Sequence, residues 1–209
     1  MKWLRKLFNS FNKRRAMKVA LCVGHSRKIK GRLDGGSISV DGTSEWEFNS
    51  RLADRIADEL EIMGVEVRVW SDYKGPTYTA SMLWLGEKVE EWGADCALEL
   101  HFNSAQPGVS GHEWLYWSSS DQGLLLAAEL NKFMVHSFPE IRQRGPKAIK
   151  PRGRGAGFLR LTHCPAVITE PFFGSSTNDW ESMNSRIDDL VAVHVEAICE
   201  WGSAEGLLL

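Results

Sequence analysis

The feature that most constrains the fold of this sequence is its alternation of short apolar runs with longer segments of helical periodicity. Residues 18–23, 96–101 and 166–170 are mostly apolar, as is typical of strands buried on both faces of a sheet. Strands separated by helices indicate parallel pairing. The sequence therefore predicts an α/β fold: a single domain with a largely parallel, twisted sheet of about five or six strands flanked by helices.

The individual elements follow from these patterns and from the glycines that end several of them. Residues 139–160 are rich in Gly, Pro and Arg, and we expect them to form a long loop. The expected strands are 18–23, 65–70, 96–101, 112–117 and 166–170, and the expected helices are 44–63, 82–92, 121–137 and 179–201.

Charge and cysteine usage exclude several classes of protein. The 209 residues carry a net charge of −2, which gives no overall field for binding nucleic acid. No apolar run approaches the roughly 18 residues that a membrane-spanning helix needs. The four cysteines are far apart and form no CxxC pair, which argues against a zinc finger or a thioredoxin-like site. We expect Cys22 and Cys96 to be reduced core residues.

The N-terminal residues 1–16 differ from the rest of the chain. They contain six cationic residues and no acidic one, and Trp3, Leu4 and Phe8 would share one face of a helix. A basic amphipathic helix that contacts an anionic membrane or lipopolysaccharide is one interpretation. The other interpretation is that these residues are a disordered leader, or that the assigned translation start lies upstream of the true one at Met17. The segment lacks the apolar stretch and cleavage site of a secretory signal peptide, so we expect the chain in the cytoplasm in which it is made.

Three expected strands run into a residue with reactive chemistry. The first is followed by His25, the third ends in His101, and the last ends in Glu170. Active sites of parallel α/β folds lie beyond the carboxyl ends of the strands, so we expect these three side chains to meet at one edge of the sheet.

Two histidines and one carboxylate, with a position left for water, form the ligand set of a catalytic zinc site. Glu45 and Glu47, in the first turn of the helix at 44–63, are the candidate carboxylates. The spacing from Ser44 to Glu47 is that of a capping box, which occupies Glu47 and leaves Glu45 free. We therefore favour Glu45 over Glu47 as the ligand.

Glu170 is the candidate general base and acid. Apolar residues surround it in sequence, and apolar surroundings raise the pKa of a carboxyl group. A raised pKa suits a group that takes a proton from water and returns it to a leaving amine. The predicted chemistry is metal-assisted hydrolysis of an amide, in which zinc lowers the pKa of water toward about 7 and polarises the carbonyl oxygen.

Four blocks of sequence resemble the signature blocks of the zinc-dependent N-acetylmuramoyl-L-alanine amidases of the amidase_3 type. They are residues 23–26 (VGHS), 44–49 (SEWEFN), 99–104 (ELHFNS) and 165–170 (PAVITE). Their order and spacing agree with the family from about residue 18 to residue 200. The resemblance implies that His25, Glu45 and His101 bind one zinc ion and that Glu170 is catalytic. It also implies hydrolysis of the amide between N-acetylmuramic acid and L-Ala in peptidoglycan.

Departures from the family pattern favour one branch of the family. Ser26 replaces the glycine that usually follows the first histidine, and Pro171 follows the catalytic glutamate. By analogy these departures resemble phage and prophage members. The expected protein is an endolysin made in the host cytoplasm and released by a holin to the cell wall or periplasm. Its expected layout is a leader at 1–16, a catalytic domain at 17–201 and a tail at 202–209.

Two rival functions remain open. The first is another zinc amidohydrolase or peptidase on the same scaffold, and the second is an inactive wall-binding homologue. A zinc assay separates the second from an enzyme, because an inert binder would hold no metal.

Residues 142–160 form a basic segment without a single acidic residue. Arginines can bind the carboxylates of the stem peptide in a bidentate manner, but a charge run is also typical of a solvated face. The candidate substrate-binding residues are Asn103, Arg152, Arg154 and Arg160.

Four further residues have competing interpretations. For His163 we favour a structural role, or one supporting the site, over ligation. We expect His112 to line the cleft or to lie on the surface, and His194 to be a core residue. Glu113 either orients a ligand histidine or is an exposed strand residue.

Overall fold

The structure is a computed structural model that describes residues 15–208 of the chain. The segment predicted to be a basic helix or a disordered leader therefore lies outside the described residues, apart from Arg15 and Ala16. The Arg15 guanidinium donates to the Asp95 carboxylate, with Nη1 and Oδ2 2.8 Å apart. Across residues 15–208, the structure has no helix with the length and apolarity to span a membrane.

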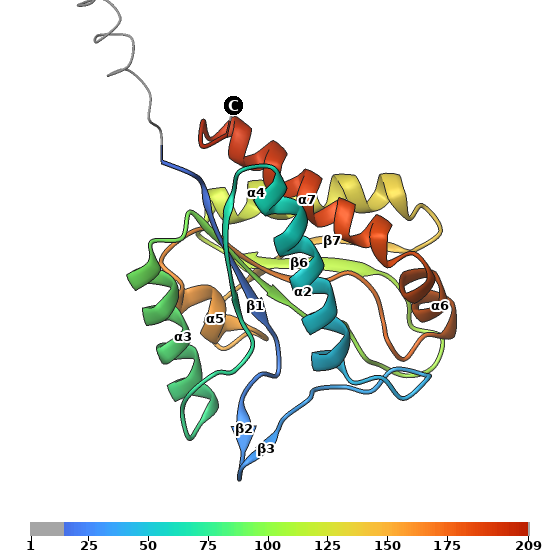
Figure 1. Ribbon diagram of the computed structural model, residues 1–209. Helices are drawn as coiled ribbons and strands as arrows, with labels where there is room; N and C mark the ends of the chain where they lie inside the picture. The colour runs from blue at the N-terminus through green and yellow to red at the C-terminus, as the bar shows by residue number, and fades with distance from the viewer. Residues whose placement is uncertain (1–14, 209) are drawn as a thin grey trace, which may run out of the picture.

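Six strands form the central sheet in the order β4-β1-β5-β8-β6-β7 (Figure 1). Every neighbouring pair is parallel except β6 and β8, which are antiparallel. The predicted α/β fold with a largely parallel sheet is thus confirmed. The strands are β1 (Lys18–Val23), β4 (Glu66–Trp70), β5 (Cys96–Leu100), β6 (His112–Trp117), β7 (Gln143–Ile149) and β8 (Ala166–Glu170).

Helices cover both faces of this sheet (Figure 1). One buried apolar cluster joins α2, α4, α6 and α7 to the sheet, and a second joins α3 and α5 to the opposite face. Because both faces are covered, β5 and β8 are buried along their whole length. The helices are α2 (Glu45–Ile62), α3 (Tyr78–Trp92), α4 (Asp121–Ser137), α5 (Ala156–Leu161), α6 (Thr177–Ser185) and α7 (Ile187–Ala204).

The start of α2 is fixed by a side-chain cap. Ser44 is the N-cap, and its side-chain oxygen accepts a hydrogen bond from the backbone amide of Glu47. Phe48 and Leu52 then bury one face of the helix in the core. This geometry places Glu45 in the first turn, at the end of the helix that lies beside the carboxyl ends of the central strands.

The long loop predicted at 139–160 is wrong, because β7 lies within that range and α5 begins in it. Within residues 15–208, strand β7 is an edge strand that pairs only with β6, and it contains Pro146, which an edge position tolerates. Its pairing with β6, rather than an apolar pattern of its own, defines it as a strand.

One expected helix also needs correction, and one small element was not expected. The single last helix predicted at 179–201 is two helices, α6 and α7, which meet at Arg186. A small hairpin of β2 (Lys28–Ile29) and β3 (Arg32–Leu33), which the sequence analysis did not predict, protrudes below the sheet in Figure 1.

The cysteines and the C-terminal residues complete the core. Cys22 and Cys96 are buried and free, as predicted. Helix α7 continues to Ala204, beyond the predicted domain end at residue 201, and Leu207 and Leu208 pack against the main core cluster.

Candidate active site

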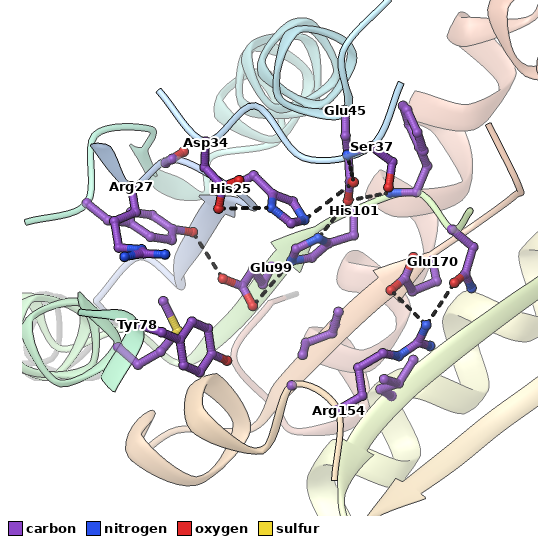
Figure 2. Close-up of a pocket in the computed structure, with 18 of the residues that line it drawn as sticks. His25, Arg27, Asp34, Ser37, Glu45, Tyr78, Glu99, His101, Arg154 and Glu170 are labelled. Carbon is purple, nitrogen blue, oxygen red and sulfur yellow. Dashed lines mark hydrogen bonds and ion pairs between the residues drawn. The ribbon is translucent and has the colours of Figure 1, made fainter. Parts of the chain in front are cut away.

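The carboxyl ends of three neighbouring strands, β1, β5 and β8, bring His25, His101 and Glu170 to one edge of the sheet. The backbone amide of Gly24 donates to Leu100 O at 2.9 Å, and that of His101 donates to Thr169 O at 3.1 Å. The ring centroids of His25 and His101 are 5.1 Å apart. The three predicted residues line one cavity of about 440 Å³, shown in Figure 2.

Glu45 reaches the same cavity from the first turn of α2. Its Oε1 lies 2.7 Å from Nδ1 of His101, and its Oε2 lies 3.4 Å from Nε2 of His25. Backbone amides hold the carboxylate in place, since Ser37 N donates to Oε2 and Phe102 N donates to Oε1. His25, Glu45 and His101 each offer one ligand atom within 4.8 Å of the others.

Glu47, the alternative carboxylate, is exposed and does not line this cavity. The predicted capping box is found only in part: the Glu47 backbone amide donates to Ser44 Oγ, but among the described residues the Glu47 carboxylate does not accept a hydrogen bond from the Ser44 amide.

The electrostatics of this cluster favour positive charge between the three side chains. Burial alone would raise the pKa of Glu45, but the ring nitrogens of His101 and His25 hold that pKa well below its usual range. Burial alone would lower the pKa of His101, but hydrogen bonds to Glu45 and Glu99 raise it well above its usual value. A site that stabilises positive charge and holds an ionised carboxylate fits a cation.

Two glycines leave room for this cluster. A Cβ on Gly24 would lie 2.2 Å from Cε1 of His101, and a Cβ on Gly36 would lie 2.6 Å from Cδ2 of His25 and 2.7 Å from Glu45 Oε2. Any side chain at either position would displace a candidate ligand. The donor set of two imidazoles and one carboxylate, packed in this way, fits a zinc ion.

Glu170 ends β8 and is 6% exposed. Burial raises its pKa to about 7, although His101 and Arg154 act in the opposite direction. Among the described residues, its Oε2 has no hydrogen-bond partner. The carboxyl group therefore lines the cavity largely desolvated, with Oε2 buried and without a hydrogen bond from residues 15–208.

Arg154 lies between Glu170 at the end of β8 and Glu113 on the neighbouring strand β6. Its Nη1 lies 3.7 Å from Glu170 Oε1 and donates to Asn103 Oδ1 at 2.8 Å. Its other terminal nitrogen pairs with Glu113, which also accepts from Asn103 Nδ2 at 3.0 Å. Glu113 therefore contacts Arg154 and Asn103 rather than a ligand histidine.

The predicted substrate-binding residues fall into two groups. Asn103 and Arg154 line the cavity. Arg152 and Arg160 are exposed and do not line it: Arg152 lies in a turn with φ of 71°, and Arg160 lies on α5. Of the basic residues in segment 142–160, only Arg154 therefore lines the cavity.

The remaining histidines lie away from the cavity. His163 is largely exposed, and its Nε2 lies 3.5 Å from Glu90 Oε2. His112 is buried, contrary to both expectations for it, and its Nδ1 accepts from Trp114 Nε1 at 3.2 Å. His194 is a core residue, as predicted, and burial lowers its pKa to about 4.

Three residues that were not predicted from the sequence also shape the site. Asp34 Oδ2 lies 3.4 Å from Nδ1 of His25, and Glu99 Oε2 lies 3.4 Å from Nε2 of His101. Tyr73 donates its phenolic hydrogen to Glu99. One signal was present in the sequence: Glu99 lies two positions before His101, so regular strand alternation directs both to the same face.

Comparison with known proteins agrees with this geometry. The family model described as N-acetylmuramoyl-L-alanine amidase (Amidase_3) matches residues 19–200. No curated protein matches the sequence.

Several solved structures share the fold. The catalytic domain of the CD27L endolysin targeting Clostridia difficile is 25% identical, with a TM-score of 0.73, over 87% of this chain and 96% of that one. The amidase AmiC2 of Nostoc punctiforme is 22% identical, with a TM-score of 0.72, over 88% and 96%. The CwlD amidase from Clostridioides difficile, solved with the GerS lipoprotein, is 17% identical, with a TM-score of 0.77, over 90% and 99%.

Proposed function

The chain belongs to the Amidase_3 family of N-acetylmuramoyl-L-alanine amidases, and from this we propose that it is a zinc-dependent enzyme that cuts the amide between N-acetylmuramic acid and L-Ala in peptidoglycan. The observation that carries the proposal is the meeting of His25, Glu45 and His101 around one point, with Glu170 in the same cavity. Metal-assisted hydrolysis of an amide requires a bound metal ion and a nearby group that can accept and return a proton, and these three candidate ligands and the Glu170 carboxyl group would supply both.

The zinc would be held by His25 Nε2, the Glu45 carboxylate and His101 Nδ1, because these atoms face one another. When bound, zinc supplies a Lewis acid that polarises a carbonyl oxygen and lowers the pKa of water. We expect one zinc per chain.

Glu170 carries the proton in this proposal. Its carboxylate accepts a proton from the attacking water as the new C–O bond forms, and then gives that proton to the amide nitrogen as the C–N bond breaks. The products are the lactyl carboxylate of the sugar and a stem peptide with a free L-Ala amine. A pKa of about 7 lets the same group accept and return the proton near neutral pH.

Arg154 and Asn103 orient the carboxyl group and the substrate. Arg154 is tied to Glu113 and Asn103, which keeps its guanidinium beside Glu170. Its side chain is still 53% exposed, so it retains donors for a stem-peptide carboxylate. We assign substrate contact to Asn103 and Arg154, and more peripheral contact to Arg152 and Arg160.

The biological setting proposed is that of a phage or prophage endolysin that causes cytolysis. The 25% identity to the catalytic domain of the CD27L endolysin supports this setting. In it, the enzyme resides in the host cytoplasm, a holin releases it to the wall or periplasm, and residues 1–16 contact an anionic membrane or lipopolysaccharide on the way.

Digestion of purified sacculi tests the proposed bond. The zinc-loaded protein is expected to release stem peptides that begin with a free L-Ala amine and to leave the glycan chains intact. New sugar reducing ends would contradict the assignment. A protein that binds zinc but releases no stem peptide would instead be another amidohydrolase on this scaffold, and one that binds no zinc would be a wall-binding homologue.

A further inference from the structure

His101 lies between two buried carboxylates, one at each ring nitrogen. Its Nδ1 is 2.7 Å from Glu45 Oε1, and its Nε2 is 3.4 Å from Glu99 Oε2 (Figure 2). Glu45 is 2% exposed and Glu99 is 5% exposed. Glu99 therefore occupies the side of the imidazole ring that faces away from the ligand cluster.

Glu99 is itself held in place. It lies on β5, two residues before His101, and its Oε1 accepts a hydrogen bond from the Tyr73 hydroxyl at 3.3 Å. Tyr73 is also buried, and its backbone amide donates to Ser26 O, next to His25. With Oε1 occupied by Tyr73, Oε2 is the oxygen directed toward His101.

We propose that Glu99 is a positioning residue for the metal ligand His101, and that Tyr73 in turn fixes Glu99. The Glu99 carboxylate accepts a hydrogen bond from the Nε2–H of His101. This contact selects the tautomer in which Nδ1 has no proton and presents its lone pair to the cation. It also sets the plane of the ring, which lies so close to Gly24 that a Cβ there would be 2.2 Å from Cε1. The inference rests on the proposed function, because it takes the His25–Glu45–His101 cluster to be a zinc site.

His25 offers an internal comparison. Its outer nitrogen, Nδ1, lies 3.4 Å from Asp34 Oδ2, so the two candidate histidines share the same arrangement. The Asp34 side chain is 32% exposed, whereas that of Glu99 is 6% exposed. Water can replace a partner at an exposed position, so the loss of Glu99 is expected to weaken zinc binding more than the loss of Asp34.

Zinc affinity, measured by competition with a chromophoric chelator on the full-length protein, tests the proposal. Glu99→Met removes the acceptor at similar length, and Glu99→Gln keeps a neutral acceptor. We expect zinc to bind about 10- to 100-fold more weakly to the Met variant, with a smaller loss for the Gln variant and for Asp34→Asn. Glu47→Gln is the matched control, because Glu47 is exposed and outside the cavity, and it is expected to leave zinc affinity unchanged.

A nitrogen-15 NMR spectrum of the imidazole groups gives a second readout that does not depend on activity. In the zinc-loaded wild-type protein, His101 is expected to show a hydrogen-bonded Nε2–H. In Glu99→Met that signal is expected to move toward the position of a free N–H. A folded Met variant with wild-type zinc affinity and an unchanged Nε2–H signal would overturn the role of Glu99. Failure of the wild-type protein to bind zinc would instead contradict the proposed function itself.

Discussion

Oε1 of Glu45 lies 2.7 Å from Nδ1 of His101, although 56 residues separate the two in the chain. Glu45 comes from the first turn of a helix and His101 from the end of a strand. Their meeting depends on the Ser44 cap and on the register of the central strands, and both are properties of the fold. The positions of these candidate ligands are therefore set by the helix cap and by strand pairing, both of which are independent of a metal ion.

Glu170→Gln should abolish most turnover while keeping the metal. The amide has nearly the same shape as the carboxyl group but cannot accept and return a proton, so kcat is expected to fall by about 10²- to 10⁴-fold. Zinc content and the far-ultraviolet circular dichroism spectrum serve as controls and should match the wild-type protein. Retention of substantial activity would remove Glu170 from its assigned role.

The same variant should change how stability depends on pH. Burial raises the pKa of Glu170 from 4.5 to about 7, so the folded state binds this proton more tightly than the unfolded state. Stability is therefore expected to fall as pH rises from about 4.5 to 7, by at most about 1.4 kcal/mol per pH unit from this group, and to level off above that range.

Urea unfolding of the zinc-free proteins at several pH values measures this effect. The stability of Glu170→Gln relative to wild type should increase between pH 4.5 and 7. A difference that stays constant across this range would show that the carboxyl group is not desolvated.

His101→Ala should remove the metal as well as the activity. Deleting one of three protein ligands leaves too few donors for a tight site, so the zinc content after gel filtration is expected to fall from about one ion per chain to almost none. Elemental analysis of the purified variant measures this. Unchanged zinc content would mean that the cation is held elsewhere.

Gly24→Ala should damage the site by displacing His101. The added Cβ would lie 2.2 Å from Cε1 of the imidazole ring, so the ring has to move and zinc affinity should fall. Gly64→Ala is a useful comparison, because that glycine has φ of 80° and no atom near the added Cβ. It should cost about 1 kcal/mol of stability through backbone strain, without affecting zinc binding. Equal zinc affinity in both variants would contradict the close packing of Gly24 on His101.

The strands that build the site could be predicted because their sequences identify them directly. The short, mostly apolar runs of β1 and β8 favour buried strands, and parallel order then places His25 and Glu170 at one edge. The capping pattern at Ser44 selected Glu45 over Glu47, and the structure has Glu45 facing the histidines. These features follow from local patterns in short segments.

Features that depend on tertiary context could not be predicted. Strand β7 has no apolar alternation, and its identity comes from pairing with β6. Among the basic residues of 142–160, only Arg154 lines the cavity, because a turn and the short helix α5 direct Arg152 and Arg160 toward solvent. The path of the backbone decides which charged residue lines the cavity. Amino-acid composition does not predict that path.

The most direct test of this account is a crystal structure of the zinc-loaded protein with anomalous scattering measured at the zinc edge. We expect a single peak about 2.0–2.2 Å from His25 Nε2, a Glu45 carboxylate oxygen and His101 Nδ1, with Glu170 in the same cavity but not bound to the ion. A peak that lacks any of these three ligands, or no peak in the cavity at all, would contradict it.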